Sequence, residues 1–375
     1  MVGRHFGFYP GIMANRILNS SGVSKSRIIT LLFFILLIVG LVMVGSASVV
    51  DAARDFQDKW YYLKLQAFWA ALASMVFIIL SNFPHQKLQK FGSAFLLATI
   101  FLLILVMIPG VGTKLLGARR WINLGLFSIQ PSEIAKLSLG IYFSSLLINH
   151  QKFSQFAATL GIVSLLVLFQ PDMGTALVII ILSFILYFGS GGAVSKLILM
   201  SLVGLGLLGL LIIATPYRFA RMKTFFDYSR DPQGSSYQIR QALIGFGSGS
   251  IFGVGIGQSK QKYDYLPEAT TDSIFAIIGE ELGMIGSVSI VLVFLIFILT
   301  GLEISKAATG FSSNLALAMV TIIGAQAFIN ISAITALVPL TGIPLSFISY
   351  GGSSLITMAS ATGIIVNISK TYDRK

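Results

Sequence analysis

Residues 28–50 read IITLLFFILLIVGLVMVGSASVV, a stretch that contains no charged side chain. A helix needs about 20 apolar residues to cross the hydrocarbon core of a bilayer, so this stretch predicts a transmembrane helix. A cleaved signal sequence has a shorter apolar segment, and further apolar stretches follow this one along the chain. The stretch therefore predicts a membrane span that the protein keeps.

The rest of the chain repeats this pattern. The apolar stretches are 28–50, 61–81, 91–109, 132–149, 156–170, 172–189, 197–214, 272–300, 313–335 and 351–368. Of the 375 residues, 55% are hydrophobic and 11% are charged, whereas a soluble domain carries roughly 25% charged residues. A soluble enzyme, a nucleic-acid-binding protein and a disordered scaffold are therefore excluded. The predicted fold class is an all-α polytopic membrane protein of about ten transmembrane helices with one long extracytoplasmic loop, 215–271.

The even number of spans places both termini on one side of the membrane. If that side is the cytoplasm, the short inner loops carry lysine and arginine with almost no acid. Total lysine and arginine counts on the two sides do not decide the orientation, but long loops cross the membrane largely regardless of charge. The sequence favours a cytoplasmic tail at 1–27, a membrane domain at 28–368 and a second cytoplasmic tail at 369–375.

Charged residues near the spans are informative, because each costs about 2.5–3.5 kcal/mol in a bilayer unless it is paired or hydrated. Arg119 and Arg120 are adjacent in GARRWIN, which suits a pyrophosphate or, equally, a lipid headgroup. Glu133 and Lys136 in QPSEIAK lie three residues apart, on one helical face where they can pair. Asp172 in QPDMGT stands at a predicted helix start, where a simple capping role stays open.

The long loop contains further candidates. Arg218 and Arg221 alternate with aromatic residues, as in a helix that lies at the membrane surface. Six glycines from Gly245 to Gly257 indicate a backbone that runs close to the membrane or to a substrate. The loop ends in YLPEATTD, where Asp272 either caps the next helix or acts chemically.

Two features follow the long loop. Glu280, eight residues after Asp272, is better explained as a buried structural acid, because Gly279, Gly283 and Gly286 indicate a closely packed helix. The last predicted loop, GIPLSFISYGGSS at 342–354, enters the final span with backbone N–H groups that could bind an anion.

Four ordered motifs, GARRWINLG with QPSEIAK, QPDMGTALVI, QKYDYLPEATTDSIFAIIGEELG and GIPLSFISYGGSSL, together resemble the SEDS family (shape, elongation, division and sporulation). The resemblance runs from about residue 30 to the end. IIGEELG and SFISYGGSSL are more similar to the division branch, FtsW, than to the elongation branch, RodA. The chain departs from the family pattern at Thr270, usually histidine, and at Ser273, usually phenylalanine.

The resemblance implies a glycosyltransferase that polymerises lipid II into peptidoglycan at the outer face of the bacterial cytoplasmic membrane, at the division septum. It implies a class B penicillin-binding transpeptidase, other division proteins and membrane lipids as partners. It places the family's catalytic aspartate on Asp272. The expected substrate-binding residues are Arg119, Arg120, Glu133, Lys136, Asp172, Arg218, Arg221, Glu268, Ser353 and Ser354.

The expected reaction is an inverting displacement. A pyrophosphate leaving group can be stabilised by cations, and one carboxylate must take the proton of the acceptor hydroxyl. We assign that role to Asp272, with Glu268 as the second choice. No ligand cluster in the sequence specifies a metal, although Mg or Mn could share the charge. A transporter of lipid-linked oligosaccharides and a non-catalytic division scaffold stay open as alternatives.

The topology can be tested with cysteines, because the chain contains none. In intact cells, an impermeant thiol reagent should label Ser235→Cys in the long loop and should leave Ser369→Cys unlabelled. Labelling of Ser369→Cys without labelling of Ser235→Cys would reverse the orientation.

Overall fold

The computed structural model describes residues 24–115, 118–125, 127–148, 152–214, 219 and 236–372. Each apolar stretch that the sequence analysis identified coincides with a helix. The helices are α2 (Lys25–Ala47), α4 (Tyr61–Asn82), α5 (Gln86–Leu105), α6 (Pro131–Leu146), α7 (Phe153–Phe169), α8 (Met173–Gly189), α9 (Val194–Ala214), α12 (Ile274–Ala307), α13 (Gly310–Ile334) and α14 (Gly352–Tyr372). Six of them, α2, α4, α5, α12, α13 and α14, are long and apolar enough to cross a membrane.

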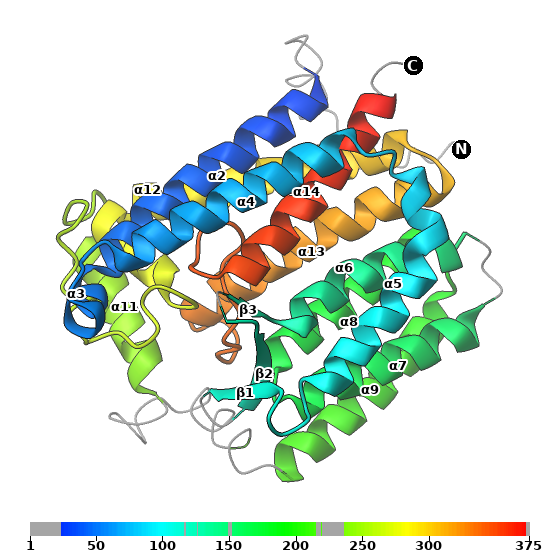
Figure 1. Cartoon of the computed structure of the whole chain (residues 1–375), viewed down its shortest axis with the longest axis horizontal. Coiled ribbons are helices and arrows are strands. Elements are labelled where there is room, and N and C mark those ends of the chain that lie inside the picture. Colours follow the sequence, from blue (N-terminus) through cyan, green and yellow to red (C-terminus); the bar gives the residue numbers. More distant parts are fainter. Residues whose placement is uncertain are drawn as a thin grey trace, which may run out of the picture.

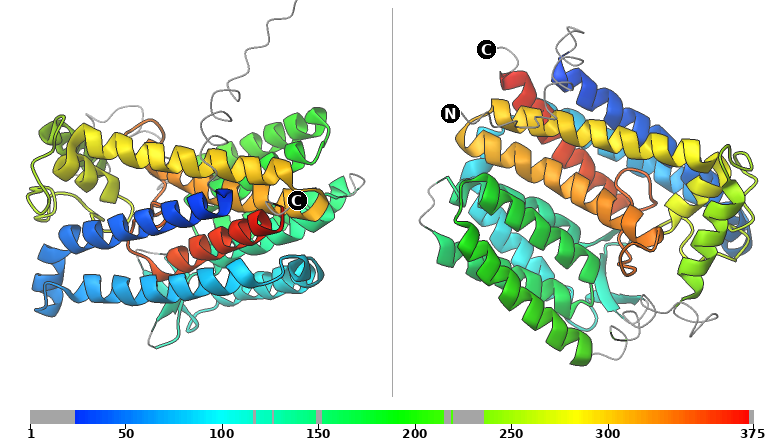
Figure 2. Two further views of the ribbon diagram at one scale, coloured as in Figure 1. Left: turned by 90° about the horizontal axis from the view of Figure 1, so that it is seen from above. Right: turned by 180° about the vertical axis from the view of Figure 1, so that it is seen from behind.

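The long helices lie side by side, and the bundle has two distinct ends (Figures 1 and 2). The terminal end holds Lys25, where α2 begins, and Tyr372, where α14 ends. The sheet end holds the short helices α3 (Val49–Phe56) and α11 (Tyr237–Gly249) and a small sheet. The part of the 215–271 loop that the structure describes, including α11, also lies at the sheet end.

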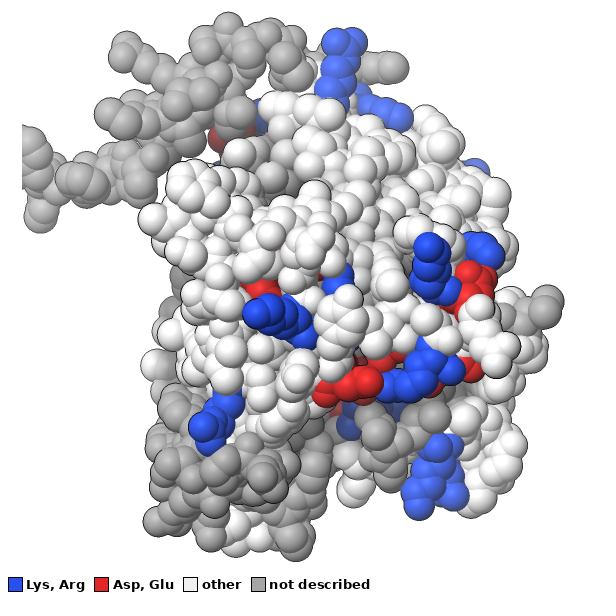
Figure 3. All heavy atoms as spheres, turned by 90° about the vertical axis from the view of Figure 1, so that its left-hand side faces the viewer, with Lys and Arg blue, Asp and Glu red and all other residues white. Residues whose placement is uncertain are grey.

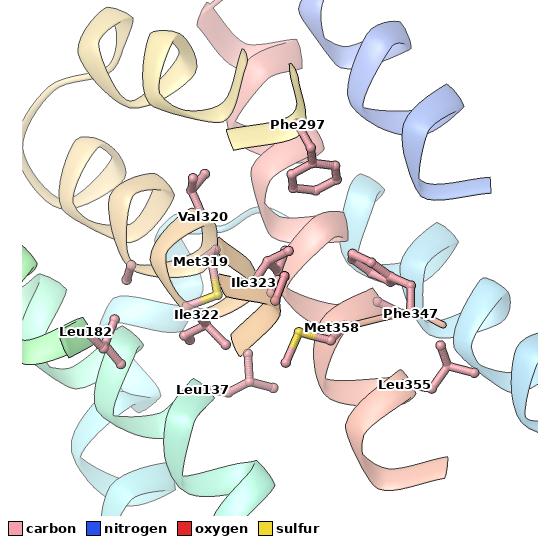
Figure 4. Packing of buried hydrophobic residues seen from close by; sticks show 14 of the residues in the cluster. Leu137, Leu182, Phe297, Met319, Val320, Ile322, Ile323, Phe347, Leu355 and Met358 are labelled. Carbon is pink, nitrogen blue, oxygen red and sulfur yellow. The ribbon is translucent and has the colours of Figure 1, made fainter. Parts of the chain in front are cut away.

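Helix α13 lies at the centre of the bundle, where α6, α8, α12 and α14 pack against it. Figure 4 shows Met319, Ile322 and Ile323 of this helix among apolar side chains from neighbouring helices. Small residues allow this close packing. A Cβ atom at Gly301 of α12 would lie 2.3 Å from Val320 Cγ2, so only glycine permits the observed approach of α12 to α13.

Three short antiparallel strands, in the order β1-β2-β3, precede α6: β1 (Gly112–Leu115), β2 (Ala118–Asn123) and β3 (Ser128–Ile129). The sequence analysis did not anticipate this sheet. Its strands have at most six residues, and a register shift at Thr113 and Lys114 interrupts the first pairing. A period of two cannot be recognised over such short and irregular strands.

Helix α12 has 34 residues, which correspond to about 51 Å, whereas the hydrocarbon core is about 30 Å thick. The helix is not continuous over this length, because Gly283, with φ of 67° and ψ of −165°, interrupts it. Beyond the break the helix runs to Ala307, and Glu303 near its end pairs with Lys25 at 3.1 Å at the terminal end. Residues 284–302 therefore form the part of α12 that matches a membrane.

The break leaves backbone N–H groups without helical acceptors, and the loop after α11 supplies them. The N–H of Met284 donates to the carbonyl of Ser250 at 2.9 Å, and the N–H of Ile285 donates to Ile251 at 3.2 Å. In the other direction, the N–H of Val254 donates to the carbonyl of Glu280 at 3.0 Å. These bonds attach the glycine-rich part of the loop firmly to α12.

A buried polar cluster strengthens this attachment. Glu281 accepts hydrogen bonds from Ser46 of α2 at 2.7 Å and from the Lys262 ammonium at 3.2 Å. The neighbouring Glu280 accepts bonds from the backbone N–H groups of Lys260, at 3.0 Å, and Gln261, at 3.2 Å. Glu280 is 1% exposed, in agreement with the structural role that the sequence favours.

Loss of the Lys262 ammonium should destabilise the fold strongly. Lys262→Met leaves the Glu281 carboxylate buried without its cation, which costs about 3–5 kcal/mol. The matched control is Lys64→Met, because Lys64 is 70% exposed and its pair with Asp58 contributes only about 0–1 kcal/mol. Denaturation of both purified variants with SDS measures the difference. Equal losses of stability would contradict this account of the cluster.

Candidate active site

A polar cavity of about 380 Å³ opens at the sheet end. Its walls come from β2, from the starts of α6 and α8, from α11, from residues 268–272 and from the segment between α13 and α14. Four carboxylates line it: Glu133, Asp172, Glu268 and Asp272. Residues that are far apart in the sequence therefore meet in one place, and each of the four motifs contributes to the lining.

Asp272 lies in the turn that leads into α12. The helix begins at Ile274, and its N-cap is Ser273 without a side-chain capping bond, so Asp272 is not the cap. The Asp272 backbone carbonyl accepts a bond from the Asn330 amide at 2.8 Å. Its carboxylate lies 3.4 Å from the Gln238 amide nitrogen and 3.4 Å from the Thr271 hydroxyl. The acid is thus positioned by α11, α13 and its own turn.

The two residues that depart from the family pattern lie beside Asp272. Ser273 is fully buried, and its hydroxyl accepts a bond from the Gln238 side-chain amide at 2.8 Å. Thr270 contributes its backbone carbonyl, which accepts a bond from the N–H of Tyr350 at 2.9 Å. Gln238 therefore connects Ser273 and Asp272 through one amide group.

Glu268 is held differently from Asp272. The residue is exposed and has a positive φ of 55°, as part of the turn before α12. Its carboxylate accepts a bond from the Thr271 hydroxyl at 2.6 Å. The Thr271 hydroxyl lies between the two acids, which keeps them at the same edge of the cavity.

Glu133 and Lys136 form a buried pair at the base of the cavity. Their side chains are 2% and 0% exposed, and the Lys136 ammonium donates to Glu133 at 2.7 Å and also to Gln326 of α13. Gln326 in turn donates to the Ser354 hydroxyl at 3.0 Å. Lys136 therefore does not line the cavity itself, but its ammonium holds Glu133, which does, and Gln326 in place.

Two buried polar atoms of the cavity wall have no hydrogen-bond partner among the described residues. They are Oε2 of Glu133 and Oγ1 of Thr341. A buried polar atom without a partner costs about 1–3 kcal/mol, and such atoms are usually satisfied by water or a ligand. Both atoms are therefore suited to bind the polar groups of a molecule in the cavity.

Asp172 is the N-cap of α8, the simple role that the sequence left open. One oxygen accepts a bond from the N–H of Thr175 at 3.1 Å. The other accepts bonds from Ser132 at 3.1 Å and from the Gln130 amide at 3.2 Å. Asp172 therefore joins the starts of α6 and α8, and both of its oxygens already have donors.

The structure separates the two adjacent arginines. Arg120 lines the cavity and donates to the backbone carbonyls of Gln170, at 3.0 Å, and Pro171. Arg119 is not part of the lining. Ser353 also lies outside the lining, where its hydroxyl donates to the carbonyl of Ser128 at 3.2 Å. Arg218 and Arg221 lie outside the described residues.

Aromatic side chains extend the cavity wall. Tyr350 lines the cavity, and its ring contacts Tyr62 edge to face with the centroids 5.2 Å apart. Burial raises the pKa of the Tyr350 hydroxyl to about 12, so this group stays protonated at neutral pH and can donate a hydrogen bond.

Sequence reasoning missed several residues of the site. Gln326 and Asn330 are four residues apart on one face of α13, and two amides in an apolar span could have been recognised as functional. Gln238 carries no comparable signal, because the polar stretch around it contains many residues of the same kind.

The surface around the cavity is charged in both signs. Figure 3 views the sheet end and shows acidic and basic side chains close together on this face. Arg54 pairs there with Asp55 at 2.8 Å and with Asp264 at 2.5 Å.

In the ranges that the structure describes, no group of three His, Cys, Asp or Glu side chains is arranged to hold a metal ion.

The fold and the cavity define the class: a multi-span membrane protein with a polar site at one end of its helical bundle. The chain belongs to the FtsW/RodA/SpoVE family, described as "Cell cycle protein", whose family model matches residues 26–374. The SEDS resemblance and the all-α polytopic fold class are thereby confirmed.

Individual relatives agree with this assignment. Stage V sporulation protein E of Bacillus subtilis (strain 168) is 38% identical over 361 residues, which cover 94% of this chain and 98% of the relative. The "Probable peptidoglycan glycosyltransferase FtsW" of Geobacter sulfurreducens is 38% identical over 362 residues, with 94% and 97% covered.

Solved structures agree as well. One chain of a structure described as "Structural coordination of polymerization and crosslinking by a peptidoglycan synthase complex" superposes with a TM-score of 0.74 and 26% identity, covering 92% of this chain and 98% of that one. The rod shape determining protein RodA of Thermus thermophilus superposes with a TM-score of 0.69 and 25% identity, covering 92% and 96%.

Proposed function

We propose that the cavity is the active site of a peptidoglycan glycosyltransferase that polymerises lipid II into β-1,4-linked glycan strands, with Asp272 as the general base. One observation carries the proposal. A single polar cavity collects Arg120, Asp172, Asp272 and Ser354 from the four motifs. Relatives named as peptidoglycan glycosyltransferases support the same substrate class.

The reaction needs one displacement at the anomeric carbon. The 4-hydroxyl oxygen of the acceptor sugar forms a bond to that carbon, while the bond from the carbon to the pyrophosphate oxygen breaks. Attack from the opposite face converts the α-linked donor into a β-linked product. The proton of the acceptor hydroxyl passes to the Asp272 carboxylate. The electron pair of the broken bond leaves with the pyrophosphate.

The residues around Asp272 stabilise the leaving group, bind the sugars and orient the base. The Arg120 guanidinium neutralises charge that develops on the pyrophosphate, and the buried atoms Oε2 of Glu133 and Oγ1 of Thr341 bind polar groups of the sugars. Gln238 orients the Asp272 carboxylate through its side-chain amide. A base held in this way can act on a correctly positioned hydroxyl.

The proposed orientation follows from the proposed chemistry. Both termini lie in the cytoplasm, and the sheet end with its cavity faces the outer side, where strands are assembled, at the division septum. The described residues include no second domain that could cross-link peptides. We therefore propose that a class B penicillin-binding transpeptidase docks beside the bundle, as the similarity to a chain of a peptidoglycan synthase complex supports.

Arg120 and Arg119 should respond differently to lysine. Arg120→Lys loses the planar guanidinium at the cavity and should reduce polymerisation of purified lipid II about 10–100-fold, which corresponds to one charge-assisted hydrogen bond. Arg119→Lys is the matched control and should retain nearly full activity. Thermal unfolding of both variants identifies any loss that comes from the Arg120 bonds to Gln170 and Pro171. Equal activities of the two variants would refute the assignment.

Asp272→Asn should abolish strand synthesis and leave a folded protein. Asparagine keeps the shape of aspartate but cannot accept the proton, so the general-base contribution of about 10²–10⁴-fold is lost. Asp172→Asn is the control and should lose much less, because asparagine also caps a helix well. Gel analysis of glycan strands made from labelled lipid II measures both.

Two outcomes would count against the proposal. Normal strand synthesis by Asp272→Asn would remove Asp272 as the base, and loss of synthesis in Glu268→Gln would then assign that role to Glu268. If the wild-type protein made no strands in the presence of its transpeptidase, the scaffold interpretation would replace the enzyme.

A further inference from the structure

The glycine turn, residues 250–257 between α11 and Ser259, does not line the cavity. Its sequence is SIFGVGIG, and no charged residue occurs from 241 to 259. Four apolar side chains of the turn are exposed: Ile251 by 50%, Phe252 by 81%, Val254 by 41% and Ile256 by 60%. Such a dense exposed apolar patch indicates a contact with an apolar environment.

The position of α12 in a bilayer indicates the depth at which the glycine turn lies relative to the membrane. The segment of α12 from Met284 to the residue before Glu303 spans about 28 Å, which matches the hydrocarbon thickness. Glu303 pairs with Lys25 at one boundary, so Met284 lies at the other. Since the backbone of Ser250 and Ile251 bonds to Met284 and Ile285, the glycine turn lies at the same boundary.

The turn also continues a surface that faces lipid. Met284, Ile285 and Val288 of α12 are 58%, 51% and 49% exposed, as expected of the outer side of a membrane helix. At Gly253, with φ of 81°, a Cβ atom would lie 2.2 Å from the Glu281 carbonyl oxygen. The backbone of the turn is therefore pressed against α12, and the apolar side chains extend beyond the bundle.

We propose that the glycine turn inserts into the lipid bilayer at the boundary between headgroups and acyl chains, beside the start of the α12 segment that matches the membrane. The occupant of this surface is lipid, because the patch is uncharged and continuous with the lipid-facing side of the helix. Ser259 and Lys262 follow the turn and enter the buried cluster with Glu280 and Glu281. Insertion of the turn thus fixes the depth of the loop that ends at Asp272.

Spin labelling tests the proposal on the full chain, because no native cysteine interferes. A nitroxide is attached to Phe252→Cys, and the protein alone is reconstituted in nanodiscs of phosphatidylethanolamine and phosphatidylglycerol. Collisions of the label with oxygen, which concentrates in lipid, are compared with collisions with a water-soluble nickel chelate. We expect oxygen collisions to dominate at Phe252→Cys.

Two control positions calibrate the measurement. Val288→Cys on the exposed side of α12 should give the lipid signature, and Lys64→Cys, whose native side chain is 70% exposed, should give the water signature. A Phe252→Cys label that resembles Lys64→Cys would place the turn in water and overturn the proposal. A label shielded from both reagents would indicate a second copy of the chain on this surface, which also overturns it. Neither outcome depends on the proposed enzymatic activity.

Discussion

The arrangement of the sheet end depends on the buried ion pair between Lys262 and Glu281. An ammonium and a carboxylate can be buried here only because each also has a hydrogen-bonding partner. Ser46 donates to Glu281 and Lys262 donates to the carbonyl of Gly257, so both charged groups are held in fixed positions. The pair joins the long loop to α2 and to the first segment of α12. It lies beside the Gly283 break, where the carbonyls of Ser250 and Ile251 accept the free backbone N–H groups, and it holds the chain that continues to Asp272. The part of the cavity wall that this loop carries is therefore attached to the membrane helices.

The four carboxylates of the cavity have distinct environments, and these suggest a division of roles. Asp172 has donors on both oxygens and joins two helix starts. Glu133 shares one oxygen with Lys136, and its other oxygen faces the cavity without a partner among the described residues. Glu268 is exposed and bonded to Thr271. Asp272 is partly buried, and its carboxylate lies 3.4 Å from the Gln238 amide nitrogen and 3.4 Å from the Thr271 hydroxyl.

The sequence predicted the spans well because a membrane helix is defined by a long apolar stretch, a property that is local in the sequence. The composition and spacing of the residues did not predict that the four motifs meet in one site; only the resemblance to the family did. Other features depend on tertiary contacts. The break at Gly283 requires the carbonyls of Ser250 and Ile251, and the difference between Arg120, which lines the cavity, and Arg119, which does not, depends on the folded arrangement of the strands. The amide of Gln238 acquires its importance from Ser273, which lies far from it in the sequence.

Ser273 shows how a departure from the family pattern can be accommodated. A buried hydroxyl needs a partner, and the Gln238 amide donates to it at 2.8 Å while the same nitrogen lies 3.4 Å from the Asp272 carboxylate. A phenylalanine at this position offers no acceptor, so the amide would be free to turn fully toward the acid. In this chain the orientation of Asp272 is thus coupled to α11, the helix that leads directly into the glycine turn. Gln238, which contacts Asp272, lies at the start of α11, and the glycine turn follows the end of the same helix. The depth at which the turn lies in the membrane therefore constrains the position of Gln238 beside Asp272.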